Sequence, residues 1–267
     1  MNQFLQKFQN WLVGRGVYLA KTQNRASISD LLKLIWPVET NLHLIRIGSK
    51  TRSDGGYLVP DDLEGIQRVF SPGVADSMDF ECEFLERGIP CELIDGSIDN
   101  PPIANNLVKF SKLWLSSATT EDSISLNDWL ESRAAVGEEL LLQMDIEGSE
   151  YESILSASDL TLSRFRIIVI ELHDLRAVFS RQGLTLFELS MKKLLNTHVV
   201  VHAHPNNCNP PIEIDGLLWP DVLELTLIRR DRVTKIGAPA RLPHHLDQDN
   251  TPNRHFALAM PGDSRKI

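Results

Sequence analysis

Three carboxylates and a glycine follow an apolar run in the middle of the chain, in the sequence Leu140-Leu-Leu-Gln-Met-Asp-Ile-Glu-Gly-Ser-Glu-Tyr151. An apolar run that stops abruptly is typical of a buried strand whose C-terminal end meets solvent. Ligands of open α/β sheets bind at that end of the strands. Asp145, Glu147 and Glu150 are therefore candidates for chemistry, although a solvated turn that leads into a helix over residues 151–156 is the alternative.

A further carboxylate, Asp95, ends another short apolar run and comes roughly twenty residues after the turn at residues 71–77, a spacing typical of nucleoside sites. In such sites the backbone of the turn approaches the cofactor, and the carboxylate accepts hydrogen bonds from ribose hydroxyls. We therefore expect Ser71, Gly73, Asp76 and Asp95 to bind a cofactor. Because this turn has a single glycine where many such loops have two or three, an ordinary strand, turn and helix is the alternative.

Two histidines and two asparagines stand at the ends of later apolar runs. His173 and His204 carry imidazoles, which titrate near neutrality and suit proton acceptance. Asn206 and Asn207 offer amides that could bind an acceptor molecule. The alternatives are strand-end histidines without a catalytic role and a simple turn after Pro205.

The elements that must position these residues follow from the apolar pattern. Strands are expected near residues 69–70, 91–94, 140–144, 166–172, 198–204 and 222–228, and helices near 78–87, 126–134, 151–156 and 184–195. The alternation of strands and helices from residue 66 to 230 predicts a mainly parallel sheet with helices on both faces. Two closing strands without a long helix between them predict an antiparallel edge. A strand pair at 42–47 and 56–59 and a helix at 27–36 precede this core.

Composition limits the class of protein. The chain has 267 residues, 42% of them hydrophobic, which suits one globular unit. Its net charge of −9 gives no electrostatic footprint for nucleic acid. Three cysteines without metal-ligand spacing predict reduced thiols in a cytoplasmic protein. The apolar N-terminus is too short for a signal peptide or a transmembrane helix; it predicts a helix that packs on the domain or on a second subunit, with an interfacial membrane anchor as the alternative.

Together these pieces resemble the FkbM-like family of class I S-adenosylmethionine-dependent methyltransferases. The resemblance rests on three segments of the chain: Ser125-Leu-Asn-Asp-Trp-Leu130, Met144-Asp-Ile-Glu-Gly-Ser-Glu-Tyr151 and Ile170-Glu-Leu-His173. Asp54-Gly-Gly-Tyr-Leu-Val59 and His202-Ala-His-Pro-Asn-Asn207 add to it. The similarity extends over residues 45–235, which is most of the chain.

The resemblance implies a Rossmann-like class I methyltransferase fold with a seven-stranded sheet and S-adenosylmethionine as methyl donor. It also implies O-methylation of a small-molecule or sugar hydroxyl. Asp145 is then the first candidate for a base or an orienter of the acceptor hydroxyl, with His173 and His204 as further catalytic candidates. Glu147 and Asn206 are expected to bind the acceptor. No metal ion is expected to take part.

Two other function classes stay open. One is a metal-dependent enzyme in which Asp145, Glu171, His173 and His204 hold one cation; the other is a methyltransferase fold that binds a ligand without catalysis. The expected organisation is an N-terminal helical extension over residues 1–40, a methyltransferase domain over 41–235 and a C-terminal tail over 236–267 that packs on the domain. The expected partner is a small-molecule acceptor such as a carbohydrate, and the N-terminal helices are the expected site of self-association.

Overall fold

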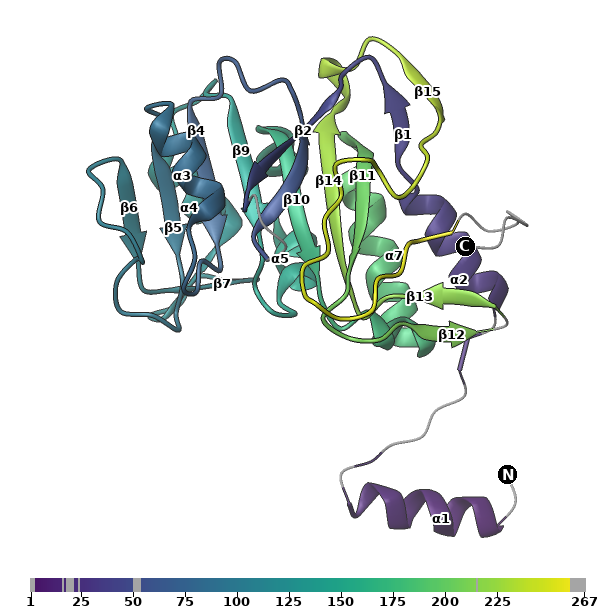
Figure 1. Cartoon of the computed structure of the whole chain (residues 1–267). Coiled ribbons are helices and arrows are strands. Elements are labelled where there is room, and N and C mark those ends of the chain that lie inside the picture. The colour runs from purple at the N-terminus through teal and green to yellow at the C-terminus, as the bar shows by residue number, and fades with distance from the viewer. Residues whose placement is uncertain are drawn as a thin grey trace.

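A seven-stranded sheet forms the centre of the computed structural model, which describes residues 3–15, 17, 22–23, 25–49, 54–214 and 216–259. The strand order is β11-β14-β10-β9-β4-β5-β6 (Figure 1). The strands are β4 (Arg68–Pro72), β5 (Cys91–Ile94), β6 (Val108–Ser111), β9 (Leu140–Met144), β10 (Phe165–Leu172), β11 (His198–Asn206) and β14 (Val222–Arg229). All six strands expected for the core are therefore present, and β6 is an addition.

The direction of the strands confirms the Rossmann-like α/β class. Strands β6, β5, β4, β9 and β10 pair in parallel, and β14 pairs antiparallel with both β10 and β11. The antiparallel edge is thus confirmed. The reversed strand is β14, which lies between β10 and the edge strand β11.

Both faces of the central strands are buried, which explains why the sequence shows continuous apolar runs there. On β9, Leu140, Leu142 and Met144 belong to one hydrophobic cluster, whereas Leu141 belongs to another on the opposite face. The first cluster lies under α2 (Arg25–Ile35), α4 (Leu126–Arg133), α5 (Glu150–Ser156) and α7 (Arg181–Leu195). Helices therefore cover this face, to which Leu162 of α6 (Asp159–Ser163) also contributes.

The opposite face carries a helix and a strand pair. Helix α3 (Asp79–Glu86) and the antiparallel hairpin of β2 (Leu44–Gly48) and β3 (Gly56–Pro60) supply the second cluster. The Thr226 hydroxyl of β14 donates a hydrogen bond of 2.7 Å to the carbonyl of Leu58, which ties the hairpin to the sheet. The expected hairpin is confirmed. Among the described residues, this hairpin covers part of the second face, where the sequence predicted helices.

The start of α4 shows how the local sequence begins an element. The Ser125 hydroxyl accepts the backbone N–H of Asp128 at 3.2 Å, as an N-cap does. In a capping box the third helical residue would bind the Ser125 N–H directly. Here the Ser125 N–H donates to the Thr119 hydroxyl at 3.0 Å, and that hydroxyl donates to the Asp128 carboxylate. The N-cap bond is therefore formed, whereas Thr119 replaces the direct return bond of a capping box.

Smaller elements surround the sheet. They are α1 (Gln3–Val13), β1 (Val38–Thr40), β7 (Trp114–Ser116), β8 (Ser123–Ser125), α6 (Asp159–Ser163), η1 (Leu175–Phe179), β12 (Ile212–Ile214), β13 (Leu217–Trp219), η2 (Arg230–Arg232) and β15 (Ile236–Pro239). Helix α1 stands apart from the sheet, and its side chains Leu5, Phe8 and Trp11 are exposed (Figure 1). No helix among the described residues is long and apolar enough to span a membrane.

The C-terminal segment packs against the end of the sheet. Phe256, Ala257 and Leu258 are buried, and the Asn207 amide donates to the carbonyls of Thr251 and Asn253 at 3.0 and 3.1 Å. Residues 260–267 of the expected tail lie outside the described residues.

Candidate functional site

Strained backbone marks the edge of the sheet where the parallel strands end. Among the described residues other than glycine, three have positive φ angles: Ala75 (47°), Glu147 (53°) and Asp174 (54°). They follow β4, β9 and β10 respectively. Such conformations cost of order 1–3 kcal/mol each and concentrate at functional sites. The C-terminal edge of the sheet is therefore the place to look for chemistry.

Gly73 allows the loops after β4 and β9 to touch. Its φ angle is +84°, and a Cβ atom at this position would overlap the carbonyl oxygen of Asp145. The Asp145 N–H donates to the carbonyl of Pro72 at 3.2 Å, and the Gly73 N–H donates to that of Ile94 at 3.0 Å. One glycine is enough for this loop, because the closest approach occurs at a single residue.

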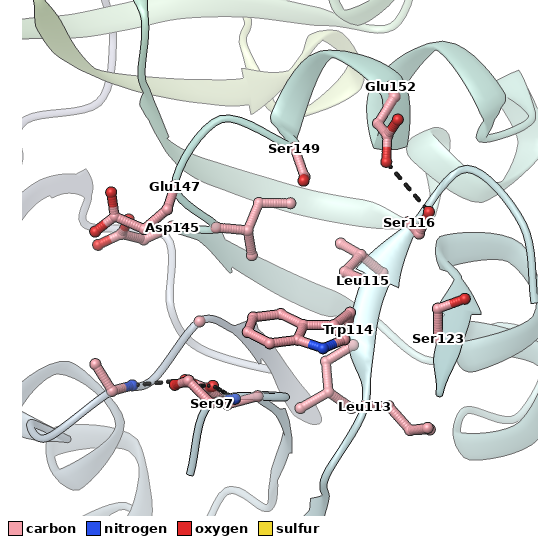
Figure 2. A pocket seen from close by; sticks show the side chains of 15 residues that line it. Ser97, Leu113, Trp114, Leu115, Ser116, Ser123, Asp145, Glu147, Ser149 and Glu152 are labelled. Atoms are coloured by element: carbon pink, nitrogen blue, oxygen red, sulfur yellow. Dashed lines mark hydrogen bonds between the residues drawn. The ribbon is translucent and has the colours of Figure 1, made fainter. Parts of the chain in front are cut away.

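A cavity of about 480 Å³ opens beside this contact (Figure 2). It is lined by residues from the loops after β4, β5 and β9, from β7 and β8 and from the start of α5: Gly73, Ala75, Ile94, Asp95, Ser97, Leu113, Trp114, Leu115, Ser116, Ser123, Asp145, Ile146, Glu147, Ser149 and Glu152. Figure 2 shows the Trp114 indole lying across the cavity, with Asp145 and Glu147 at one end. Its size is that of a small-molecule site, for which about 300–1,000 Å³ is usual.

Trp114 was not expected from the sequence. The residue is 53% exposed, although it lies in a cavity. A Cβ atom on Gly96 would overlap the indole, so the ring rests directly on the backbone beside Asp95. The available signal was a tryptophan between two leucines in a segment that is otherwise polar, Ser111-Lys-Leu-Trp-Leu-Ser-Ser117, with a glycine directly after the strand-end carboxylate. An exposed aromatic ring that rests on a glycine offers a flat face for a planar ligand.

Asp95 is held as a carboxylate. Its Oδ2 accepts the Ala75 N–H at 2.8 Å, and its Oδ1 accepts both the N–H and the hydroxyl of Ser97, at 2.7 and 2.6 Å. Burial alone would raise the pKa of Asp95, but these hydrogen bonds outweigh it and hold the pKa below the ordinary value. These donors hold the carboxylate in a fixed position at the wall of the cavity.

The other two residues expected on the cofactor side lie elsewhere. Ser71 is fully buried under the loop, where its hydroxyl donates to the side-chain oxygen of Gln143 at 2.6 Å and bonds with Glu81. Asp76 is exposed on the loop after β4 and does not line the cavity. Of the four residues, the structure brings Gly73 and Asp95 together at the cavity.

His173 lies at the centre of a carboxylate group. Its Nδ1 is 3.0 Å from Glu150 Oε1, and its Nε2 is 3.7 Å from Asp145 Oδ1 and 3.6 Å from Glu147 Oε2. Burial lowers the pKa of His173, but the hydrogen bond and charge of Glu150, followed by the charges of Asp145 and Glu147, raise it to about 9. At neutral pH His173 is therefore an imidazolium, which holds a proton and does not accept one.

Asp145 has the opposite character. Burial raises its pKa to about 7, against the charge of His173, which lowers it. Its Oδ1 is buried and has no hydrogen-bond partner among the described residues. Glu147 reaches the same end of the cavity with a largely exposed side chain. Asp145 is thus able to accept a proton near neutrality, which suits a general base.

His204 and Asn206 are placed differently from Asp145. His204 lies on β11, with Nδ1 3.7 Å from Asp247 Oδ2, and lines a separate cavity together with Gln248. Asn206 is buried, donates to Glu171 Oε1 at 2.9 Å and accepts the Cys208 N–H at 2.9 Å. The structure therefore brings Asp145, Glu147 and His173 together and leaves His204 and Asn206 outside their cavity.

The family comparison adds an independent finding. Residues 106–191 match the family described as the Methyltransferase FkbM domain. This match confirms the resemblance to the FkbM-like family. The FkbM-matched segment holds Trp114, Asp145, Glu147 and His173, whereas the Gly73 loop precedes it.

Comparison with curated proteins gives no match. Similar solved structures include a chain of a fibrillarin/Nop5p complex, with 10% identity, a TM-score of 0.38 and coverage of 62% of this chain and 74% of that one. Another is the 23S rRNA methyltransferase ErmE, with 10% identity, a TM-score of 0.36 and coverage of 83% and 72%.

Proposed function

We propose that this FkbM-like protein is an S-adenosylmethionine-dependent methyltransferase that methylates a hydroxyl group of a small molecule or sugar. The observation that carries the proposal is a single cavity with Asp95 and Trp114 in its walls and Asp145 and Glu147 at one end. A transfer reaction needs both reactants held in one place, and such positioning is worth about 7–11 kcal/mol. Residues 41–235 would form the methyltransferase domain. Ile28 and Leu32 of the extension pack into its core.

The residues fit the parts of this cofactor. Asp95 offers carboxylate oxygens to ribose hydroxyls, and Trp114 offers a flat face to the adenine ring. Gly73 lines the cavity, and a side chain at this position would overlap the carbonyl oxygen of Asp145. When bound, S-adenosylmethionine supplies an electrophilic methyl group.

Asp145 would act on the acceptor. A hydroxyl that gains a methyl group must lose its proton, and Asp145 lines the end of the cavity with no hydrogen-bond partner for its Oδ1 among the described residues. The His173 Nε2 lies 3.7 Å from this Oδ1 and 3.6 Å from Glu147 Oε2, and its charge would hold both carboxylates in place. Glu147, with its exposed carboxylate, would orient the rest of the acceptor.

The cofactor assignment is tested at Asp95. Because hydrogen bonds to a charged group are worth about 1.5–3 kcal/mol, Asp95→Ala should weaken S-adenosylmethionine binding by roughly ten- to a hundredfold or more in calorimetry. Asp99→Ala is the matched control, since Asp99 is exposed on the same loop and pairs with Lys112. An unchanged dissociation constant in Asp95→Ala would remove this residue from the site.

The acceptor-side assignment is tested at Asp145. Asp145→Asn keeps the size of the side chain and removes the base, so turnover at saturating cofactor should fall by on the order of 10²–10⁴. Turnover is followed as S-adenosylhomocysteine released with a panel of sugar and phenol acceptors. If Asp145→Asn loses cofactor affinity but keeps its maximal rate, the role belongs to cofactor binding. Failure of the wild-type chain to bind S-adenosylmethionine would refute the proposed function itself.

A further inference from the structure

A second group of carboxylates lies beyond Asp145, outside the cavity. Asp54, Glu171 and Glu224 each offer one carboxylate oxygen, and these three atoms all lie within 4.8 Å of one another. Glu171 and Glu224 are paired across β10 and β14 and are only 3% and 4% exposed. Asp54 approaches from the loop that precedes β3 and is exposed to solvent.

Among the described residues, the direct hydrogen-bond partners of these carboxylates carry no charge. Tyr57 and Asn206 donate to Glu171 at 3.4 and 2.9 Å, and Asn250 donates to Glu224 at 2.6 Å and to Asp54 at 3.0 Å. His173 is 3.8 Å from Glu171 but is already shared with three other carboxylates.

The other positive groups described nearby make no ion pair with these carboxylates. His204, the cross-strand partner of Glu224, and then Arg46 act on Glu224 through their charges, but the Arg46 Nε donates to the carbonyl of Ser49. Among the described residues, no lysine or arginine forms an ion pair with any of the three carboxylates. Buried charges are normally paired or bound to a metal ion.

Asn250 gives the independent sign that a positive centre belongs here. This residue is 7% exposed, and its Oδ1 is buried without a hydrogen-bond partner, although its Nδ2 touches both Glu224 and Asp54. The nitrogen faces the carboxylates and the oxygen is turned away from them, because without a cation an inward oxygen would face two carboxylates. With a cation between the carboxylates, rotation of the amide turns this oxygen inward as a ligand.

We infer that Asp54, Glu171 and Glu224 bind a divalent cation, with the Asn250 side-chain oxygen as a fourth ligand after rotation of its amide. An all-oxygen set suits Mg²⁺, Mn²⁺ or Ca²⁺. Oxygen ligands lie about 2.0–2.6 Å from these ions, so two ligands of one ion are at most about 4–5 Å apart. The spacing of the three carboxylates falls within that limit. This inference departs from the expectation, drawn from the sequence, that no metal takes part.

A second trio, Asp145, Glu147 and His173, has the same spacing but suits a cation less well. Its histidine is already bonded to Glu150, and the Glu147 side chain is largely exposed. At the Asp54 site, by contrast, two of the three carboxylates are buried on neighbouring strands, which fixes their positions.

The location of the cation gives it a role that rests on the proposed function. The His173 Nε2 lies 3.8 Å from Glu171 and 3.7 Å from Asp145, so the two sites adjoin. An ion with four protein ligands keeps coordination positions for water or for acceptor oxygens. The cation would thus select acceptors with two neighbouring oxygens, such as vicinal diols, and direct one of them toward Asp145.

The test uses Mn²⁺ alone with the full-length protein. Electron paramagnetic resonance of free Mn²⁺ should show one saturable site with a dissociation constant tighter than about 1 mM. Loss of even an outer partner of a metal ligand costs about 10–100-fold in affinity, so Glu171→Gln and Glu224→Gln should each weaken Mn²⁺ binding at least tenfold. Glu188→Gln, on the surface of α7, is the control and should bind as the wild type does.

Folding is checked in the same proteins. Each Glu→Gln change at the site replaces one of several crowded carboxylates by a neutral amide of the same size, so without metal these variants should melt no lower than the wild type. Addition of Mn²⁺ should raise the melting temperatures of the wild type and of Glu188→Gln only. Absence of saturable Mn²⁺ uptake, or equal uptake by the variants, would overturn the inference. Because no cofactor is present, neither result depends on S-adenosylmethionine binding. Full turnover with a vicinal diol after chelation would overturn the acceptor role.

Discussion

At the scale of single residues, the loop after β4 shows why one glycine is sufficient. Gly73 and Gly88 both have positive φ angles, +84° and +75°, but only Gly73 has a neighbour that an added Cβ would overlap. Both Gly→Ala changes carry the backbone penalty of roughly 1–2 kcal/mol. Gly73→Ala should lose about 1–3 kcal/mol more, because overpacking is added.

Chemical denaturation of the two alanine variants measures this difference. The comparison between them isolates the contact with Asp145, since the backbone conformation is similar in both. Equal losses of stability would mean that the loop moves away freely and that the close approach is not fixed.

Trp114 supports a second prediction at this scale. Base stacking on an aromatic side chain is worth about 1–3 kcal/mol, so Trp114→Ala should weaken S-adenosylmethionine binding by roughly five- to a hundredfold. Trp114→Phe keeps an aromatic face on Gly96 and should retain most of the affinity. Calorimetry decides between them. An alanine variant that binds as tightly as the wild type would show that the indole packs on the backbone without contributing to cofactor binding.

The sequence identified the site residues that end long buried strands. Asp145, Glu147 and His173 could be placed because the apolar runs before them have no other explanation than burial on both faces. Trp114 and Asn250 could not, since each lies in a segment without periodicity, and their positions depend on contacts with Gly96 and Asp54 that are far away in the sequence.

At the scale of elements, two serines before helices make a matched pair. Ser125 caps α4 through its hydroxyl, whereas Ser149, at the same position of α5, makes no side-chain cap bond. Ser125→Ala should therefore lower the free energy of unfolding by about 0.5–2 kcal/mol. Ser149→Ala should cost clearly less. Urea denaturation measures both, and a larger loss for Ser149→Ala would contradict the assignment of the cap.

Long elements were predictable and short ones were not. Strands β9, β10, β11 and β14 are buried over nearly their whole length, and their mainly apolar runs are long enough to be distinguished from turns. The three-residue strands β7, β8, β12 and β13 have no period of their own, and their existence depends on a partner strand. The hairpin over the second face was found as a pair of strands, but its place on the sheet follows from packing, for example at Thr226.

At the scale of the whole molecule, one buried histidine links stability to pH. His198 is fully buried, its Nε2 lies 2.8 Å from the Phe165 carbonyl and its Nδ1 2.8 Å from the Thr197 hydroxyl. Burial lowers its pKa from 6.5 to about 4, and the charge of Arg229 adds to this while that of Asp231 opposes it. Between pH 6.5 and 4, His198 is therefore protonated in the unfolded chain but stays neutral in the folded chain.

A depressed folded-state pKa gives stability that is present above pH 6.5 and is lost as the pH falls toward 4. The loss from His198 should reach about 3 kcal/mol. Asp145 and Glu224, whose pKa values are raised to about 7, act in the opposite direction, because their stabilising protons are lost as the pH rises. These carboxylates contribute equally in the wild type and in a His198 variant, so the difference between the two proteins isolates the contribution of His198.

The measurement is the free energy of unfolding of His198→Gln at pH 6.5 and at pH 4. Its decrease between these values should be about 3 kcal/mol smaller than that of the wild type. His43→Gln, at an exposed histidine beside Asp61, should keep the wild-type decrease. Identical pH dependence in His198→Gln and the wild type would show that His198 is protonated inside the fold.

The wall around Asp54 joins segments from opposite ends of the chain: Asn250 donates to Asp54 across 196 residues. During synthesis, residue 250 is added only after all seven strands of the sheet. Every residue that lines the cavity lies between Gly73 and Glu152 and is therefore made earlier. Contacts of long sequence separation also form slowly, and chains fold from the N-terminus as they emerge. With the cation site inferred at Asp54, the growing protein acquires a place for its methyl donor before it completes the place for the molecule to be methylated.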